Sequence, residues 1–277
     1  MKSAKPLFCF DIDGTLFRWQ LILCVLDRLA TDYPHIAGLL KETTSSLVGY
    51  KNRQVPFEDF TQAYVEHFWH QENYVGIRVE DVVRVAKAIA QQEGDRVYVI
   101  TRELLRTAKE LGWATLAISG SPQEAVEEFL RPFEVDGVIA VTHPVDSDGR
   151  YAPGTINHPV HDKGAALQRF LDQHPEEIDL AQSVAIGDSL ADASMLKRVG
   201  WPICFNPNHA LNQMARQHGW PILIELRNIH FAMKHRPPSS SGDAMSLGEI
   251  LPKAMGDGIQ ERLKGLGIVG LHYPAFA

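Results

Sequence analysis

The stretch Phe8-Cys9-Phe10-Asp11-Ile12-Asp13-Gly14-Thr15-Leu16 is the most informative part of this chain. A short apolar run ends in two carboxylates at alternate positions, followed by a Gly-Thr turn. Because alternate residues of a strand share a face, we expect Asp11 and Asp13 to project together where the strand ends. Core packing gives no reason to place two like charges there. A divalent cation does, and so does a reaction that needs a nucleophile beside an acid/base.

The composition predicts a globular protein. With 277 residues, 45% apolar and 22% charged, the chain has room for one large domain or a core with a smaller insert. A net charge of −7 argues against nucleic-acid binding, which depends on an excess of Lys and Arg. No signal-peptide pattern and no apolar run of ~20 residues, the length that spans a bilayer, is present. We therefore expect a soluble cytoplasmic protein with no nucleic-acid partner and no membrane span.

The order of predicted elements indicates an α/β fold. Short apolar strands alternate with amphipathic helices and short loops, which is typical of a doubly wound parallel (Rossmann-like) sheet with helices on both faces. Ligands of such sheets bind at the carboxyl ends of strands. The expected strands are 7–10, 115–119, 135–141, 183–186, 202–205 and a last one at 221–225, and the expected helices are 96–111, 123–130, 163–172, 191–199 and 211–218.

Residues 17–95 have helical rather than strand periodicity, so we expect a small all-helical insert after the first strand. We predict an α/β core formed by residues 1–16 and 96–235, and a helical cap at 17–95. Residues 236–277 begin as a Pro- and Ser-rich linker and continue as a tail with an approximate helical stripe, to which we assign no role.

Polar groups follow further predicted strands. Ser119 ends the second strand and precedes Gly120 and a helix start, where a hydroxyl and backbone N–H groups form a ready phosphate cradle. Lys163 starts a helix, although helix electrostatics favour a cation at the other end, so a bound anion is one explanation for it. Asp188 and Asp192 follow a later apolar strand. All of these residues are expected at the edge that carries Asp11.

This ordered set over roughly residues 7–230 resembles the four motifs of the haloacid dehalogenase superfamily of phosphatases: DxDGT, a Ser after a strand, a Lys, and GDSxxD. The helical insert is similar to the type-1 cap of that superfamily. The two Gly-Trp-Pro-Ile segments at 200–203 and 219–222 are similar to the phosphoserine-phosphatase-like subgroup, subfamily IB.

The resemblance implies an enzyme that hydrolyses a small phosphorylated metabolite. Asp11 would be the nucleophile that forms an aspartyl-phosphate, and Asp13 the general acid and base. The implied cofactor is Mg²⁺, held by the Asp11 and Asp188 carboxylates and the Asp13 backbone carbonyl. The resemblance also implies that the transferred phosphate is bound by Ser119, Gly120 and Lys163, with Thr15 and Asp192 in support.

Three departures from the phosphoserine phosphatase pattern concern substrate recognition. Gln20 takes the place of a Glu that usually binds the substrate ammonium, and Tyr64 takes the place of an Arg that usually binds the substrate carboxylate. Ala191 takes the place of an Asn in the last motif. We therefore expect a phosphatase that does not prefer phosphoserine. Trp19 lies at the cap entrance, where a specificity contact and cap packing are both open.

Two other functions are compatible with these residues. The first is a phosphotransferase or mutase that passes the aspartyl-phosphate to an acceptor other than water. The second is a non-catalytic protein that binds a phosphate ligand, although such a protein gains little from keeping both Asp11 and Asp13.

Overall fold

The computed structural model describes residues 4–54, 71–154, 157–174, 178–226, 229–234, 243–266 and 269–270. The predicted apolar stripe from Phe57 to Phe68 lies outside the described residues, and Tyr64 lies there with it.

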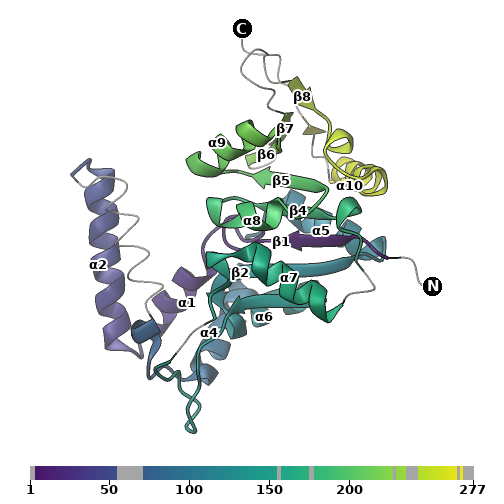
Figure 1. Cartoon of the computed structure of the whole chain (residues 1–277). Coiled ribbons are helices and arrows are strands. Elements are labelled where there is room, and N and C mark those ends of the chain that lie inside the picture. Colours follow the sequence, from purple (N-terminus) through teal and green to yellow (C-terminus); the bar gives the residue numbers. More distant parts are fainter. Residues whose placement is uncertain are drawn as a thin grey trace.

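A single nine-stranded sheet organises the described chain, in the order β3-β2-β1-β4-β5-β6-β7-β8, with β9 beside β7. The strands from β3 to β6 are parallel, as predicted, and β1 lies between β2 and β4 in the middle of the sheet (Figure 1). The strand bounds are β1 Leu7–Phe10, β2 Ala114–Pro122, β3 Gly137–Val141, β4 Val184–Gly187, β5 Trp201–Phe205, β6 Pro221–Leu226, β7 Ile229–Lys234, β8 Asp243–Met245 and β9 Val269–Gly270.

Helices cover both faces of the sheet, which confirms the doubly wound fold. Phe8 and Phe10 of β1 face an apolar cluster built with α1, α4, α5, α6 and α10, whereas Leu7 and Cys9 face a second cluster built with α7, α8 and α9. The helix bounds are α1 Leu21–Leu29, α2 Pro34–Lys51, α4 Val79–Glu93, α5 Val99–Glu110, α6 Gln123–Leu130, α7 Lys163–Gln173, α8 Ala193–Leu196, α9 His209–His218 and α10 Lys253–Gly265.

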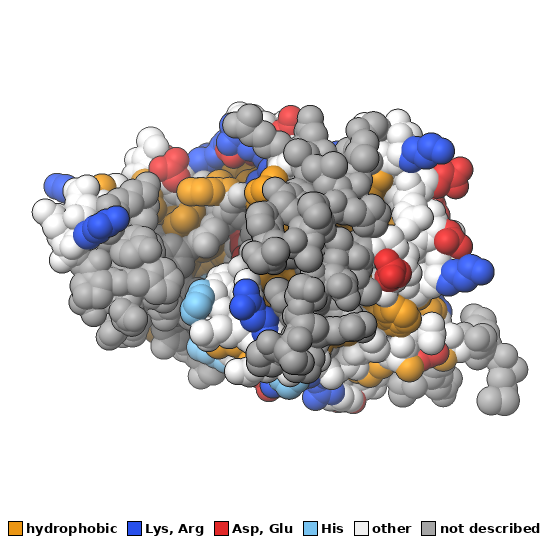
Figure 2. Space-filling view, turned by 90° about the horizontal axis from the view of Figure 1, so that it is seen from above, with side chains coloured by type: hydrophobic (Ala, Val, Ile, Leu, Met, Phe, Trp, Pro, Cys, Tyr) orange, Lys and Arg blue, Asp and Glu red, His pale blue; other side chains and the backbone are white. Residues whose placement is uncertain are grey.

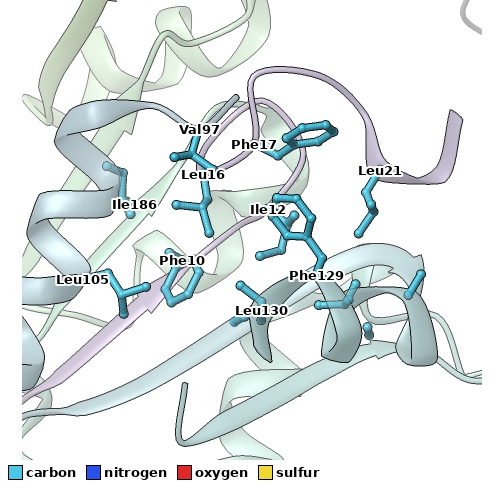
Figure 3. Close-up of a cluster of buried hydrophobic side chains, with 14 of the residues drawn as sticks. Phe10, Ile12, Leu16, Phe17, Leu21, Val97, Leu105, Phe129, Leu130 and Ile186 are labelled. Atoms are coloured by element: carbon cyan, nitrogen blue, oxygen red, sulfur yellow. The ribbon is translucent and has the colours of Figure 1, made fainter. Parts of the chain in front are cut away.

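The segment that follows β1 is anchored by its apolar side chains. Ile12 and Leu16 are fully buried, and the ring of Phe17 lies 5.0 Å from that of Phe129 on α6 (Figure 3). Ile12 is thus held in the core between Asp11 and Asp13, just beyond the carboxyl end of β1.

The described part of the predicted cap is helical, with α1, α2, α4 and the 3₁₀ turn Gln71–Tyr74. Helices α1 and α4 pack against α6 and belong to the same apolar cluster as the sheet, while α2 contacts α1 and stands apart from the sheet in Figure 1. A boundary between cap and core at residues 16 and 96 therefore stays a prediction.

Two sequence-based expectations are wrong. The strand at 221–225 is not the last, because β7 pairs with β6 in antiparallel fashion and β8 pairs with β7. The helix expected at 191–199 is shorter, a 3₁₀ turn at Leu190–Asp192 followed by α8 at Ala193–Leu196.

The C-terminal stripe is a packed helix. Met255, Ile259 and Leu263 of α10 are buried against α5, and Arg262 Nη1 lies 3.0 Å from Glu103 Oε2. Among the described helices, none has the length and apolarity needed to cross a membrane. On the face seen in Figure 2, basic and acidic side chains of the described residues are interspersed.

We predict that Ile259→Ala lowers the free energy of unfolding by about 2–4 kcal/mol, because it leaves a cavity between α10 and α5. Leu266→Ala, at an exposed position at the end of the same helix, should cost less than about 0.5 kcal/mol. Urea denaturation followed by circular dichroism measures both. Equal stabilities of the two variants would mean that α10 is not part of the cooperative core.

Candidate active site

Lys163, the first residue of α7, is the centre of a buried charge cluster. Its side chain is 2% exposed, and Nζ donates to Asp11 Oδ1 at 2.5 Å and to Asp192 Oδ1 at 2.6 Å. Burial alone would lower the pKa of Lys163, but the two carboxylates reverse this and raise it above its usual value. The two carboxylates explain why a lysine stands at the N-terminus of α7, where helix electrostatics disfavour a cation. They also keep the Lys163 side chain in its charged form.

Asp11 follows β1 directly and is 4% exposed. Its backbone N–H donates to Ile186 O at 3.1 Å, which fixes it beside the end of β4. Lys163 holds Oδ1, and Oδ2 accepts no hydrogen bond from the described residues. Burial raises the pKa of Asp11 to about 7, although Lys163 opposes this. One oxygen of the Asp11 carboxylate is therefore bound by Lys163, and the other has no hydrogen bond from the described residues.

Asp192 is a positioning group for this cluster. Its Oδ1 accepts from Lys163, and its Oδ2 accepts from the backbone N–H groups of Asp188 at 3.1 Å and Ser189 at 2.9 Å. A Cβ on Gly187 would lie 2.4 Å from Asp192 Cγ, so the close approach depends on glycine. Asp192 thus joins Lys163 to the loop after β4.

Asp13 takes a different direction from Asp11. Its Oδ1 accepts from the Leu21 N–H at 2.5 Å, at the start of α1. Its Oδ2 accepts from the hydroxyls of Ser119 at 3.1 Å and Ser121 at 2.9 Å, both at the end of β2. Burial raises the pKa of Asp13, while these hydrogen bonds oppose the rise. Asp13 therefore sits between β2 and α1 rather than in the cluster around Lys163.

Three carboxylates at this edge of the sheet form a cluster that is suited to bind a cation. Asp11, Asp188 and Asp192 have carboxylate oxygens within 4.8 Å of one another. The half-buried Asp188 carboxylate accepts no hydrogen bond from the described residues, and burial together with Asp11 and Asp192 raises its pKa well above the usual value. Since both oxygens of Asp192 are already engaged, Asp11 and Asp188 are left as oxygen donors, the type that Mg²⁺ prefers.

Gly14 makes room for Asp188. It has φ +85°, and a Cβ there would lie 2.4 Å from Asp188 Oδ2. The glycine of the DxDGT stretch thus serves two purposes: it adopts a left-handed turn and it leaves space for a carboxylate from another strand end.

A cleft of about 800 Å³ opens from these residues. Asp13, Gly14 and Asp188 line its inner end, and α1 and α2 line its walls. Trp19 is 61% exposed at this cleft, and Gln20 lines it with a buried Oε1 that lacks a hydrogen-bond partner. The volume is typical of sites for small molecules.

The other predicted residues fall nearby, with one outside the described chain. Thr15 is fully buried and its hydroxyl has no partner among the described residues, so its predicted supporting role has no visible contact. Gly120 packs so closely that a Cβ would lie 2.7 Å from Val160 Cγ2. Tyr64 lies outside the described residues.

Two features were missed by sequence reasoning. The Ser121 hydroxyl donates to Asp13, and the alternation of Ser121 with Ser119 along β2 is the sequence signal that could have found this contact. Arg18 forms an ion pair with the buried Glu225, donates to Val97 O at 3.0 Å and lies over the Tyr98 ring at 4.5 Å. No sequence pattern links these residues, because β6 and the loop after β1 meet only in the folded chain.

Fold and site together define a Rossmann-like α/β enzyme with a lysine–carboxylate cluster at the carboxyl edge of its parallel sheet. The chain belongs to the haloacid dehalogenase-like hydrolase family, which it matches over residues 8–197.

Phosphatases are among its relatives. The histidinol-phosphatase of Neisseria meningitidis serogroup C is 27% identical over 231 residues, which cover 79% of this chain and 98% of the relative. The phosphoserine phosphatase of Methanocaldococcus jannaschii is 26% identical over 238 residues, which cover 85% of this chain and 99% of the relative.

Solved structures share the fold. A Bordetella pertussis Tohama I protein of unknown function has a TM-score of 0.62 and 19% identity, over 80% of this chain and 99% of that one. A phosphoserine phosphatase with an analogue of its phospho-aspartyl intermediate has a TM-score of 0.54 and 23% identity, over 81% of this chain and 95% of that one.

We predict that Gly14→Ala weakens Mg²⁺ binding at least about 10-fold, because the new Cβ displaces Asp188. Gly149→Ala is the matched control, since Gly149 has φ +73° but open space around its Cβ position. Both variants should lose about 1 kcal/mol of stability to the left-handed backbone. Calorimetric titration with Mg²⁺ and urea denaturation measure the two effects, and equal Mg²⁺ affinities would contradict the role of Gly14.

Proposed function

We propose that this protein is a Mg²⁺-dependent phosphatase that hydrolyses a small-molecule phosphate monoester through an aspartyl-phosphate. The observation that carries the proposal is the Asp11 carboxylate, which has Oδ1 held by a buried ammonium and Oδ2 without a hydrogen bond from the described residues. A carboxylate with one fixed and one uncommitted oxygen is suited to act as a nucleophile. The family and the phosphatases among its relatives support the same chemistry.

In the first half-reaction, Asp11 Oδ2 bonds to phosphorus while the ester P–O bond breaks and Asp13 gives a proton to the leaving oxygen. In the second, Asp13 takes a proton from water, the water oxygen bonds to phosphorus, and the bond between phosphorus and Asp11 breaks. Burial, which raises the pKa of Asp13, favours the protonated form that the first step needs.

Lys163 would neutralise charge on the phosphoryl group. An ammonium has three N–H donors, and Asp11 and Asp192 use two of them, so one is left for a phosphate oxygen. The Gly120 N–H and the Ser119 hydroxyl are the other proposed phosphate donors, and Ser119 would exchange its contact with Asp13 for one with the phosphate.

Mg²⁺ fits the donors that this chain offers. Asp11, Asp188 and the Asp13 carbonyl would hold it. The fit rests on the Asp188 carboxylate, which lacks a hydrogen bond from the described residues and whose position depends on the missing Cβ of Gly14. When bound, the ion would offset the negative charge of the carboxylates and of the incoming phosphate.

The substrate would be a small phosphorylated metabolite other than phosphoserine, because Gln20 cannot pair with an ammonium as a carboxylate does. A phosphotransferase or mutase would use the same Asp11 chemistry with an acceptor in place of water. Release of inorganic phosphate without an added acceptor distinguishes hydrolysis from transfer.

We predict that Asp11→Asn lowers kcat at least about 10³-fold, because an amide does not replace the carboxylate nucleophile. Asp148→Asn, which removes an exposed charge at a distant turn, should leave kcat unchanged. Borohydride reduction during turnover, followed by mass spectrometry, should find the reduced residue at position 11. A reduced residue elsewhere, or an active Asp11→Asn, would refute the assignment.

Removal of divalent metal with EDTA should abolish turnover, and Mg²⁺ should restore it. Mg²⁺ should also raise Tm, because it relieves repulsion among Asp11, Asp188 and Asp192. Asp188→Asn should lose most of this rise in a thermal-shift measurement, while Asp148→Asn keeps it. Full turnover in EDTA-treated protein would contradict the proposed cofactor.

A further inference from the structure

The cleft beside the active site has one wall whose chemistry the proposed reaction does not use. That wall is a face of α1, from which Leu23, Cys24, Asp27 and Arg28 line the cleft, with Gln20 just before the helix. Across from it, Leu40, Thr43 and Thr44 of α2 line the other side. Leu23, Cys24 and Leu40 give the cleft an apolar part, and along α1 this part lies between Gln20 and Asp27 in the sequence.

Most charges in these walls are already paired. Arg18 forms its ion pair with Glu225. Arg28 donates to Gln92 at 2.9 Å and to Glu93 at 2.8 Å. Asp27 is exposed and makes no hydrogen bond or ion pair with the residues that the structure describes. Apart from the acidic residues of the active site, Asp27 is therefore the charged side chain that has no partner among the described residues that line the cleft.

A second polar group on the same face also lacks a partner. The Oε1 atom of Gln20 is buried without a hydrogen bond, and a buried acceptor left unsatisfied is costly. Gln20 directly precedes Leu21, whose N–H binds Asp13, so Gln20 lies at the end of this wall that is next to the acid/base group. Because Oε1 has almost no accessible surface, the Gln20 side chain would have to turn this oxygen toward the cleft to accept a hydrogen bond from a bound molecule.

The helix sets the distance between the two groups. Gln20, Cys24 and Asp27 are spaced as i, i+4 and i+7, so they lie on one face. Seven residues at the α-helical rise separate Gln20 and Asp27 by about 10 Å along the cleft. The wall therefore offers an acceptor near the catalytic end, an apolar middle and a negative charge farther out.

We propose that the cleft selects an elongated cationic phosphate monoester, with a hydrogen-bond donor near the phosphate for Gln20 and an ammonium or similar cation about 10 Å beyond it for Asp27. This inference rests on the proposed phosphatase function, because it places the phosphate at Asp11. Asp27 is then a specificity-determining residue. It would bind the substrate cation in place of the Glu that the phosphoserine phosphatase pattern has at position 20.

The test compares phosphate release from phosphorylated ω-amino alcohols and from n-alkyl phosphates of equal length, with chains extended one carbon at a time. We expect kcat/KM to favour the amine at least about 10-fold at one chain length, mainly through KM. In Asp27→Asn this amine-to-alkyl ratio should fall toward one, and in Asp27→Lys the preference should shift to ω-carboxyalkyl phosphates. Asp148→Asn should keep the wild-type ratio.

A binding measurement separates the two proposals. Calorimetric titration of the same amines and alkyl phosphates into Asp11→Asn, and into Asp11→Asn combined with Asp27→Asn, reports the preference without turnover. If no ester is hydrolysed but the amine preference in binding depends on Asp27, the proposed function fails and the cation site stands. If esters are hydrolysed with no amine preference, or with one that survives in Asp27→Asn, the cation site is refuted.

Discussion

The contact of the Lys163 ammonium with Asp11 and Asp192 holds three parts of the molecule in register: the end of β1, the start of α7 and the loop after β4. All three side chains are almost completely buried. Removing one member of a buried ion pair costs about 3–5 kcal/mol, because it leaves an unpaired charge without water. The same contact aims one oxygen of Asp11 away from the lysine, so the interaction that stabilises the site also orients its proposed nucleophile.

One ammonium does not balance the carboxylates around it. Asp188 approaches Asp11 and Asp192 because Gly14 and Gly187 have no Cβ at the points of closest approach. Burial is the first cause of the raised pKa values of Asp11 and Asp188, and the neighbouring carboxylates raise them further. The proposed Mg²⁺ would reduce the repulsion among these carboxylates, whose close approach depends on the glycines of two separate motifs.

Helix α1 connects the chemistry with the cleft. Its first N–H binds Asp13, and the hydroxyls of Ser119 and Ser121 hold the same carboxylate from β2. The side of α1 that faces the cleft carries Asp27 two turns farther along. Contacts between a substrate and this helix would therefore bear directly on the position of the acid/base group, whose hydrogen bonds depend on where α1 begins.

Local pattern was enough to predict the six parallel strands, the helices on both faces and the motif residues at strand ends, because strand periodicity and the Asp-x-Asp-Gly turn depend on neighbours in sequence. Contacts between distant segments were not predictable in this way. The packing of α10 on α5, the ion pair of Arg18 with Glu225 and the hydrogen bond from Ser121 to Asp13 join segments that are far apart in the sequence. Their free energy comes from burial and hydrogen bonding between surfaces that meet only after the chain has folded.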